Sequence, residues 1–381
     1  MTTMSQPITV TSAIINQALR PMTAWNLEPT TLDSQGPISL DLITTAARVV
    51  DTSGVIEILE SWDKADNPNR YRGGRPAQVS ARSALILLIV AGLDDKPLNI
   101  TEAVEILRYR LDGKAWAAAG LDLNLFTDRR NPQWYSRIYR TIRNRARALI
   151  DPYPETKKGR RYDKDVFAAL KATRSPALIE QRKKRIAIFD SALALGSARL
   201  AGDDVFKRHI GDYASDATMY ATSTTMPRSG SKLTSSEPDA GSYVREGNHH
   251  PGENKGAIKV KHGFDPTLAV AVGGAFGESV PDLIVGVSVD KPGHRPGQNV
   301  LQAVAMLERT GFPRRYMIGD MAYSPGSKPE YYQAPMRKNG WKIVGDIPNK
   351  EEARGIAATY VAWSFPMENA LPSSFDAPAG P

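Results

Sequence analysis

The stretch RRYMIGDMAYS, residues 314–324, decides how the rest of the chain is interpreted. A short apolar run, a Gly and then Asp320 are followed by a Ser-Pro-Gly turn at residues 324–326. This pattern predicts a buried strand that ends in a carboxylate at the point where a loop begins. Ligands of open α/β sheets bind beyond the carboxyl ends of the strands, so Asp320 is a candidate site residue.

A second stretch, HIGDYASDATMY at residues 209–220, has the same arrangement and places Asp216 at the end of a strand. Asp212 is the alternative to Asp216, because it also comes after an apolar residue and its even spacing puts both side chains on one strand face. Two strand-borne aspartates brought together by a fold are a natural Mg²⁺ or Mn²⁺ site, since Mg²⁺ takes one or two carboxylates and completes its shell with water or phosphate. The competing interpretation is that both aspartates are structural and accept backbone hydrogen bonds.

Composition excludes several classes of protein. The chain has 381 residues, 41% of them hydrophobic, and no cysteine, which excludes disulfides, cysteine-ligated zinc and thiol catalysis. The N-terminus has no basic region followed by an apolar run, so we expect no signal peptide. The longest apolar run, residues 84–93, is shorter than the roughly 20 residues that cross a bilayer. We therefore expect a cytoplasmic protein with no membrane partner.

Positive charge is concentrated in one segment. Residues 129–185 hold eighteen Lys and Arg against five Asp and Glu, a net charge of +13, whereas the whole chain carries +8 and the remainder therefore −5. A localised basic segment is the electrostatic signature of a nucleic-acid binder. The alternative is a solvated helical face with no partner.

Periodicity divides the chain into five parts. We expect a flexible arm at residues 1–40, an all-helical DNA-binding domain at 41–150, a basic linker at 151–176, an α/β core at 177–350 with a loop insertion at 223–257, and a disordered tail at 351–381. The order of strands and helices in the core predicts a mixed sheet flanked by helices.

Three elements of this prediction are specific. Apolar spacing predicts helical structure from Leu40 to Trp62, and Ser80 is the expected N-cap of a helix that ends at Leu93. The nearly continuous apolar run at residues 283–289 predicts a strand that is buried on both faces.

The basic side chains suggest where DNA would bind. In the predicted helix 134–147, arginines alternate with aromatic residues, which suits contacts to phosphates and bases. A basic linker and a basic first half of the next helix would add contacts whose strength depends on salt. The predicted DNA-binding residues are Arg137, Arg140, Lys157, Lys158, Arg160, Arg161, Arg182, Lys183, Lys184, Arg185, Lys259 and Lys261.

Five motifs in register carry a resemblance to a known family. They are SDATMYAT (215–222), KVKHGFDPTLAVAV (259–272), HRPGQNVLQAVAML (294–307), YMIGDMAYS (316–324) and GWKIVGDIP (340–348). In this order they resemble the DDE transposases of bacterial insertion sequences, and the loop PDAGSYVREGNH (238–249) resembles an insert of actinobacterial members. The resemblance spans about residues 75–350.

The resemblance implies a fold, an activity and partners. The core would be RNase H-like, and Asp216 and Asp320 would match the first and second catalytic carboxylates. The chain would cleave and transfer DNA strands at the ends of a mobile element with Mg²⁺ or Mn²⁺, because two divalent ions can stabilise both the attacking and the leaving oxygen. We would expect a homodimer bound to double-stranded DNA in the bacterial nucleoid.

One departure from the family weakens this interpretation. The family requires a third acid, usually a Glu on a helix beyond the equivalent of IVGDIPNK (343–350), and here the candidates are Glu351 and Glu352, which lie where the family has a loop. The alternative function is a truncated, catalytically inactive remnant that only binds DNA. A stand-alone nuclease is a weaker alternative, and the adjacent His249 and His250 are interpreted as surface residues rather than metal ligands.

Overall fold

The computed structural model gives the arrangement of most of the chain. It describes residues 36–69, 78–122, 124–125, 131, 133–147, 149–153, 161–222, 230–235, 237, 239–246, 258–273, 281–320, 323 and 328–345. The predicted arm at 1–40 therefore lies outside the described residues except for 36–40, and the predicted tail at 351–381 lies wholly outside them.

The first part of the described chain is helical. Its elements are α2 (Leu40–Ser53), α3 (Val55–Asp66), α4 (Ala81–Leu93), α5 (Ile100–Glu105), the π-helix η3 (Ile106–Arg110), α6 (Gly113–Ala118) and α8 (Trp134–Arg147). The predicted N-cap is confirmed, because the Ser80 side chain accepts a hydrogen bond from the backbone N–H of Ser83. The helical prediction for Leu40 to Trp62 is confirmed, with one break that was not predicted: Gly54 adopts φ of 67°, a left-handed conformation that ends α2 and starts α3.

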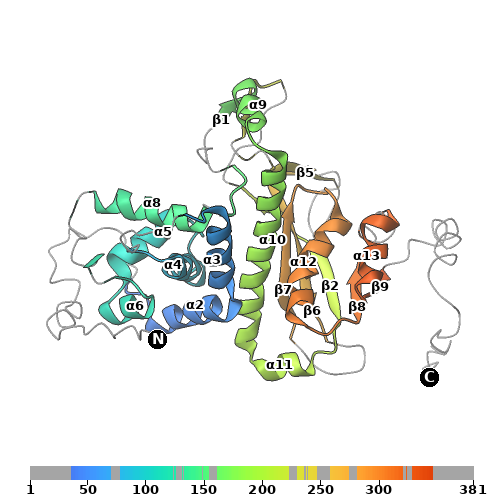
Figure 1. The fold of residues 1–381 in the computed structure, drawn as a ribbon, viewed down its shortest axis with the longest axis horizontal. Coiled ribbons are helices and arrows are strands. Elements are labelled where there is room, and N and C mark those ends of the chain that lie inside the picture. Colours follow the sequence, from blue (N-terminus) through green and yellow to red (C-terminus); the bar gives the residue numbers. More distant parts are fainter. Residues whose placement is uncertain are drawn as a thin grey trace, which may run out of the picture.

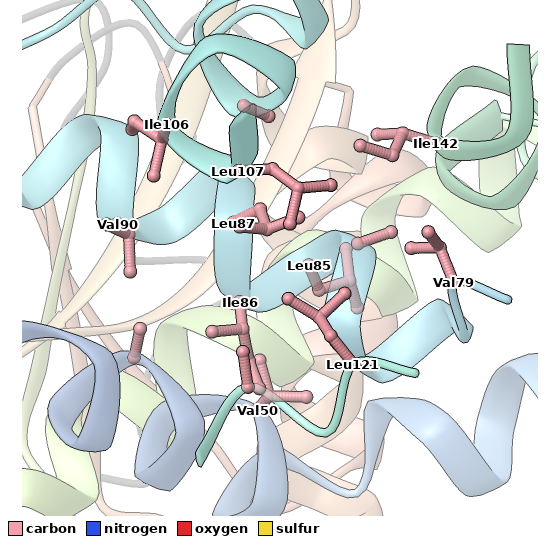
Figure 2. Packing of buried hydrophobic residues seen from close by; sticks show 14 of the residues in the cluster. Val50, Val79, Leu85, Ile86, Leu87, Val90, Ile106, Leu107, Leu121 and Ile142 are labelled. Atoms are coloured by element: carbon pink, nitrogen blue, oxygen red, sulfur yellow. The ribbon is translucent and has the colours of Figure 1, made fainter. Parts of the chain in front are cut away.

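Helix α4 forms the centre of the helical core, which explains its apolar sequence. Leu85, Ile86, Leu87 and Val90 of this helix are all buried, and they meet residues from the surrounding helices on several sides (Figure 2). A helix that is apolar around most of its circumference is stable only when neighbours cover it all round. The 84–93 run is therefore a buried core helix, as expected.

Short elements occupy two segments that we predicted to lack structure. Strand β1 (Arg161–Asp163) and helix α9 (Lys164–Ala172) lie within the predicted linker. Strands β4 (Leu233–Ser235) and β5 (Gly241–Glu246) lie within the predicted loop insertion at 223–257. β1 pairs with β4 in an antiparallel ladder, so this part of the insertion forms one small unit with β1 and α9 (Figure 1), whereas β5 joins the larger sheet.

Helix α10 (Pro176–Ala198) stands between the helical part and the sheet (Figure 1). The sequence also predicts this helix, because Pro176 is a favourable first-turn residue and the helical pattern continues to about residue 200; both features are confirmed. Phe189 and Ala192 belong to the helical core, whereas Leu195 and Ala198 belong to the core of the sheet. The helix continues into η5 (Arg199–Ala201) and α11 (Asp203–Arg208).

The second part is a mixed sheet of seven strands. Its strands are β2 (Tyr213–Ala217), β3 (Tyr220–Ala221), β5, β6 (Ile258–Ala271), β7 (Leu283–Asp290), β8 (Tyr316–Gly319) and β9 (Lys342–Gly345). β2, β8 and β9 are parallel neighbours, and β6 runs antiparallel to β2, β7, β3 and β5. The predicted α/β class with a mixed sheet is confirmed.

Helix α12 (Pro296–Thr310) covers one face of the sheet. Val300, Val304 and Leu307 are fully buried in the core of the sheet. At Gly286 of β7, an added Cβ would come within 2.1 Å of the Ala303 carbonyl oxygen, so glycine is what allows this close approach. η6 (Pro329–Tyr331) and α13 (Gln333–Lys338) then lead into β9.

The prediction that the strand at 283–289 is buried on both faces is wrong. β7 pairs with β6 alone among the described strands, and its side chains alternate, with Val285 fully buried and Ile284 44% exposed. Its other side is occupied by α10, where Ser191 Oγ donates to the Val287 carbonyl and accepts from the Val287 N–H, each at 2.9 Å. A helix therefore protects this edge of the sheet.

Across the described residues, none of the helices combines the length and the apolar character that crossing a membrane requires.

Candidate functional site

Asp216 and Asp320 lie at the same end of two neighbouring parallel strands. The β2–β8 register aligns Ser215 with Gly319, and each aspartate is the next residue along its own chain. Both side chains are exposed. The structure thus brings together two residues that are 104 positions apart in sequence, at the carboxyl edge where the sequence pattern predicted a site.

Gly319 permits the close packing at this edge. A Cβ at this position would lie 3.0 Å from Ser215 Oγ and 3.2 Å from Cδ2 of Tyr323. Glycine before Asp320 therefore allows β8 to lie close to β2 and allows the Tyr323 ring to pack against the end of the strand. The glycine of the Gly-Asp motif is thus explained by packing, and the aspartate by its candidate role at the site.

The structure adds a third carboxylate that sequence reasoning missed. Tyr323 is buried, and burial raises the pKa of its phenol, with smaller contributions in the same direction from Asp216, Asp320 and Asp265. Burial also raises the pKa of Asp265, and Asp216 raises it further, although a hydrogen bond from the Gly293 N–H opposes the shift. Asp265 therefore lies near enough to Asp216 and to Tyr323 to interact with them electrostatically. The sequence signal that could have identified Asp265 is the Asp-Pro pair at residues 265–266, which interrupts the apolar pattern of β6.

Asp212, the alternative to Asp216, is a structural residue. It lies before the first residue of β2, at the opposite end of the strand from Asp216, and it is 4% exposed. Arg315 donates two hydrogen bonds to the Asp212 carboxylate, one from Nε at 2.7 Å and one from Nη2. Because Asp212 is buried and both of its carboxylate oxygens accept hydrogen bonds from Arg315, it is poorly placed to bind a ligand. Exposed Asp216 is therefore the better candidate for a site residue on β2.

The candidate ligands Glu351 and Glu352 lie outside the described residues, as do His249 and His250. Among the residues that the structure does describe, no group of three or more His, Cys, Asp or Glu side chains is placed to hold a metal ion. The pair Asp216 and Asp320 nevertheless fits a hard divalent cation, because Mg²⁺ accepts one or two carboxylates and takes its remaining ligands from water or phosphate.

Two of the predicted DNA contacts lie on α8. Arg140 is exposed, and its Nε donates to the Ser136 carbonyl at 3.2 Å, within its own helix. Arg137 is partly buried, on the side of the helix nearer to the core. Trp134 and Ile138 are fully buried, so the helix packs through one face and presents Arg140 on the other.

The prediction that Arg185 contacts DNA is wrong. Its side chain is 6% exposed and forms a two-pronged ion pair with Asp66 of α3, at 2.6 and 2.8 Å, while its guanidinium lies over the Trp62 ring at 5.1 Å. Arg182 also pairs with Asp66, at 3.2 Å, and the hydrogen bond from Arg185 is the main cause that lowers the pKa of Asp66. These arginines fasten α10 to the helical part.

The rest of the basic set divides by exposure. Lys183 pairs with Asp239 at 3.4 Å, whereas Lys184 and Lys261 are exposed. Lys157, Lys158 and Arg160 lie outside the described residues, and only the backbone is described for Arg161 in β1 and Lys259 in β6.

Of the predicted site residues, Asp216 and Asp320 meet at one edge of the sheet, and Arg140, Lys184 and Lys261 remain available to a partner. No protein-family model, curated protein or solved structure matches this chain, so its function is inferred from these residues.

Proposed function

We propose that the sheet, with α12 on one face, is an RNase H-like catalytic core, and that the chain is a DNA transposase of the DDE type. The observation that supports this most is the position of Asp216 and Asp320, each directly at the end of one of two adjacent parallel strands. The resemblance assigns these two residues as the first and second catalytic carboxylates, and the β2–β8 register agrees with that assignment.

The site chemistry would be phosphodiester cleavage and strand transfer at the ends of an insertion sequence. Bound Mg²⁺ or Mn²⁺ would supply charge stabilisation for the oxygens that attack and leave phosphorus. Asp216 and Asp320 would hold the cation and fix its position relative to the DNA backbone. Their exposure leaves room for a phosphate, and the buried Tyr323 behind them supports the strand end.

Three exposed basic side chains support double-stranded DNA as the partner. Arg140 on α8, Lys184 on α10 and Lys261 on β6 are exposed, and none of them is used in an ion pair that fastens described elements together. Contacts of this kind act through phosphates, so binding should weaken steeply as salt rises. A flat salt response would exclude this mode of binding.

Strand cleavage tests the proposal. A labelled duplex that carries candidate element ends is incubated with Mg²⁺ or Mn²⁺ and with the wild type, Asp216→Ala or Asp204→Asn, the last a matched control because its carboxylate is 89% exposed on α11. We expect cleavage by the wild type and the control, and none by Asp216→Ala, with DNA binding retained by all three.

The same assay separates the alternatives. Cleavage by Asp216→Ala at the wild-type rate would refute the assignment of the carboxylate. No cleavage by any of the three, with DNA still bound, would favour the remnant that only binds DNA. Cutting without strand joining would point to a nuclease. As a second measurement, Asp320→Asn should lose Mg²⁺ binding in calorimetry without a change in DNA affinity.

A further inference from the structure

A cavity of about 800 Å³ opens between the helical part, α10 and the sheet. Its lining comes from the segments around residues 97–99 and 147–153, from α10, and from β3, β6 and β7. Cavities of a few hundred to a thousand Å³ at the meeting point of two structural units are where proteins bind small molecules.

The walls of this cavity are mainly apolar. Leu98 and Ile150 contribute from the helical part, Ile186 from α10, and Phe264 and Val289 from the sheet. Leu98, which is 65% exposed, is one of the residues that line this cavity. A ligand with an apolar body would bury this surface.

Asp190 of α10 places one carboxyl group among these walls. Among the residues that the structure describes, the Asp190 carboxyl has no ion-pair or hydrogen-bond partner, and burial raises its pKa to about 7. Asp190 is partly exposed at the cavity, and it lies between Phe189, which is packed in the core, and Ser191, which is fully buried and hydrogen-bonded to β7. The helix therefore holds an unneutralised acid in the cavity wall.

The cations that line the cavity are already matched with other acids. Arg147 pairs with Asp151 at 2.7 Å, and Lys183 pairs with Asp239 at 3.4 Å.

On the sheet side, Arg295 pairs with Asp290 at 3.1 Å. The remaining cation, Lys184, is exposed and forms no ion pair with Asp190. Among the described residues that line the cavity, none is therefore a counter-ion for Asp190, and an anionic ligand would bring a second negative charge beside it.

We propose that this cavity binds a small organic cation with an apolar body, whose amine or amidinium group pairs with Asp190 while its body contacts Ile186, Phe264 and Val289. The pair would be formed away from bulk water, where a charge-assisted hydrogen bond contributes more than it does at the surface. This proposal does not depend on the function proposed above.

The test uses benzamidine as the cation and benzamide as a neutral molecule of the same shape. Binding is measured by calorimetry at pH 8 to the full chain and to Asp190→Asn, Ile186→Phe and Asp204→Asn. Asp190→Asn keeps the side-chain shape and removes the charge, Ile186→Phe fills the cavity one helical turn away, and the exposed Asp204 is the matched control. Circular dichroism checks that each variant is folded.

We expect the wild type and Asp204→Asn to bind benzamidine equally, and both Asp190→Asn and Ile186→Phe to bind it about 10- to 100-fold more weakly. Benzamide should not distinguish the wild type from Asp190→Asn. The proposal is overturned if the wild type fails to bind benzamidine, if Asp190→Asn binds it as tightly as the wild type, or if Ile186→Phe leaves the affinity unchanged.

Discussion

Replacing Asp190 by asparagine should change how the stability of the protein depends on pH. In the unfolded chain this carboxyl ionises at its ordinary pKa of 3.8, and in the folded protein at about 7. Between these two values the folded state holds a proton that the unfolded state has released, so the contribution of Asp190 to stability falls as pH rises. Below pH 3.8 both states are protonated and no such cost exists.

The magnitude follows from the size of the shift. One pKa unit corresponds to about 1.4 kcal/mol, so the raised pKa of Asp190 lowers the free energy of unfolding by about 4 kcal/mol at pH 8, where the folded carboxyl is ionised, and by about 2 kcal/mol at pH 5, where it keeps a proton that the unfolded chain has released. The amide introduced by Asp190→Asn would carry no charge at either pH, although it has its own desolvation cost, which is the same at both. The stability of the variant relative to the wild type should therefore rise by about 2 to 3 kcal/mol between pH 5 and pH 8.

Urea unfolding followed by tryptophan fluorescence measures this difference, without any added amine, at pH 5, 6, 7 and 8. All other ionisable groups are shared by the two proteins, so their titration cancels when the two free energies of unfolding are subtracted. A difference that stays constant over this range would show that Asp190 ionises normally in the folded protein and would refute the reasoning about its surroundings.

Two further predictions concern the interactions that hold α10 against the helical part and against β7. Arg185→Met should lower the free energy of unfolding by about 3 kcal/mol, because it leaves Asp66 without its main partner, whereas Lys184→Met on the exposed side of the helix should change it by less than about 0.5 kcal/mol. Equal effects in thermal unfolding would contradict the structural role of Arg185. Ser191→Ala should cost about 1 to 3 kcal/mol, since the backbone groups of Val287 would lose their hydrogen bonds. Hydrogen exchange at the Val287 amide should then become faster, and an unchanged rate would show that α10 does not protect β7.

Local signals were enough to predict several elements. Helix α4 was predicted to within a residue because Ser80 caps a long apolar run, and α10 because a proline opens it. The Asp216 and Asp320 strands were found because each combines a short apolar stretch with a carboxylate before a loop. These features could be predicted because each depends on residues that are close together in the sequence.

Features that depend on distant contacts were not predictable. The pairing of Arg185 with Asp66 joins positions 119 residues apart, so two arginines of the basic run, Arg182 and Arg185, are internal ion pairs rather than free side chains. β7 has the sequence of a strand buried on both faces, yet α10 occupies its outer edge. A local feature was also missed: the apolar spacing continues on both sides of Gly54, so it gave no sign of the left-handed residue that separates α2 from α3.

Helix α10 contributes side chains to both hydrophobic cores, and this sharing has a consequence for how the molecule melts. Phe189 and Ala192 stabilise one core, and Leu195 and Ala198 the other, within three turns of the same helix. Losing the helix would expose apolar surface on both sides at once, so neither core can unfold while the other keeps its full contacts. Calorimetry should therefore register the helical part and the sheet as a single cooperative unit, and a cut in α10 should leave no stable half.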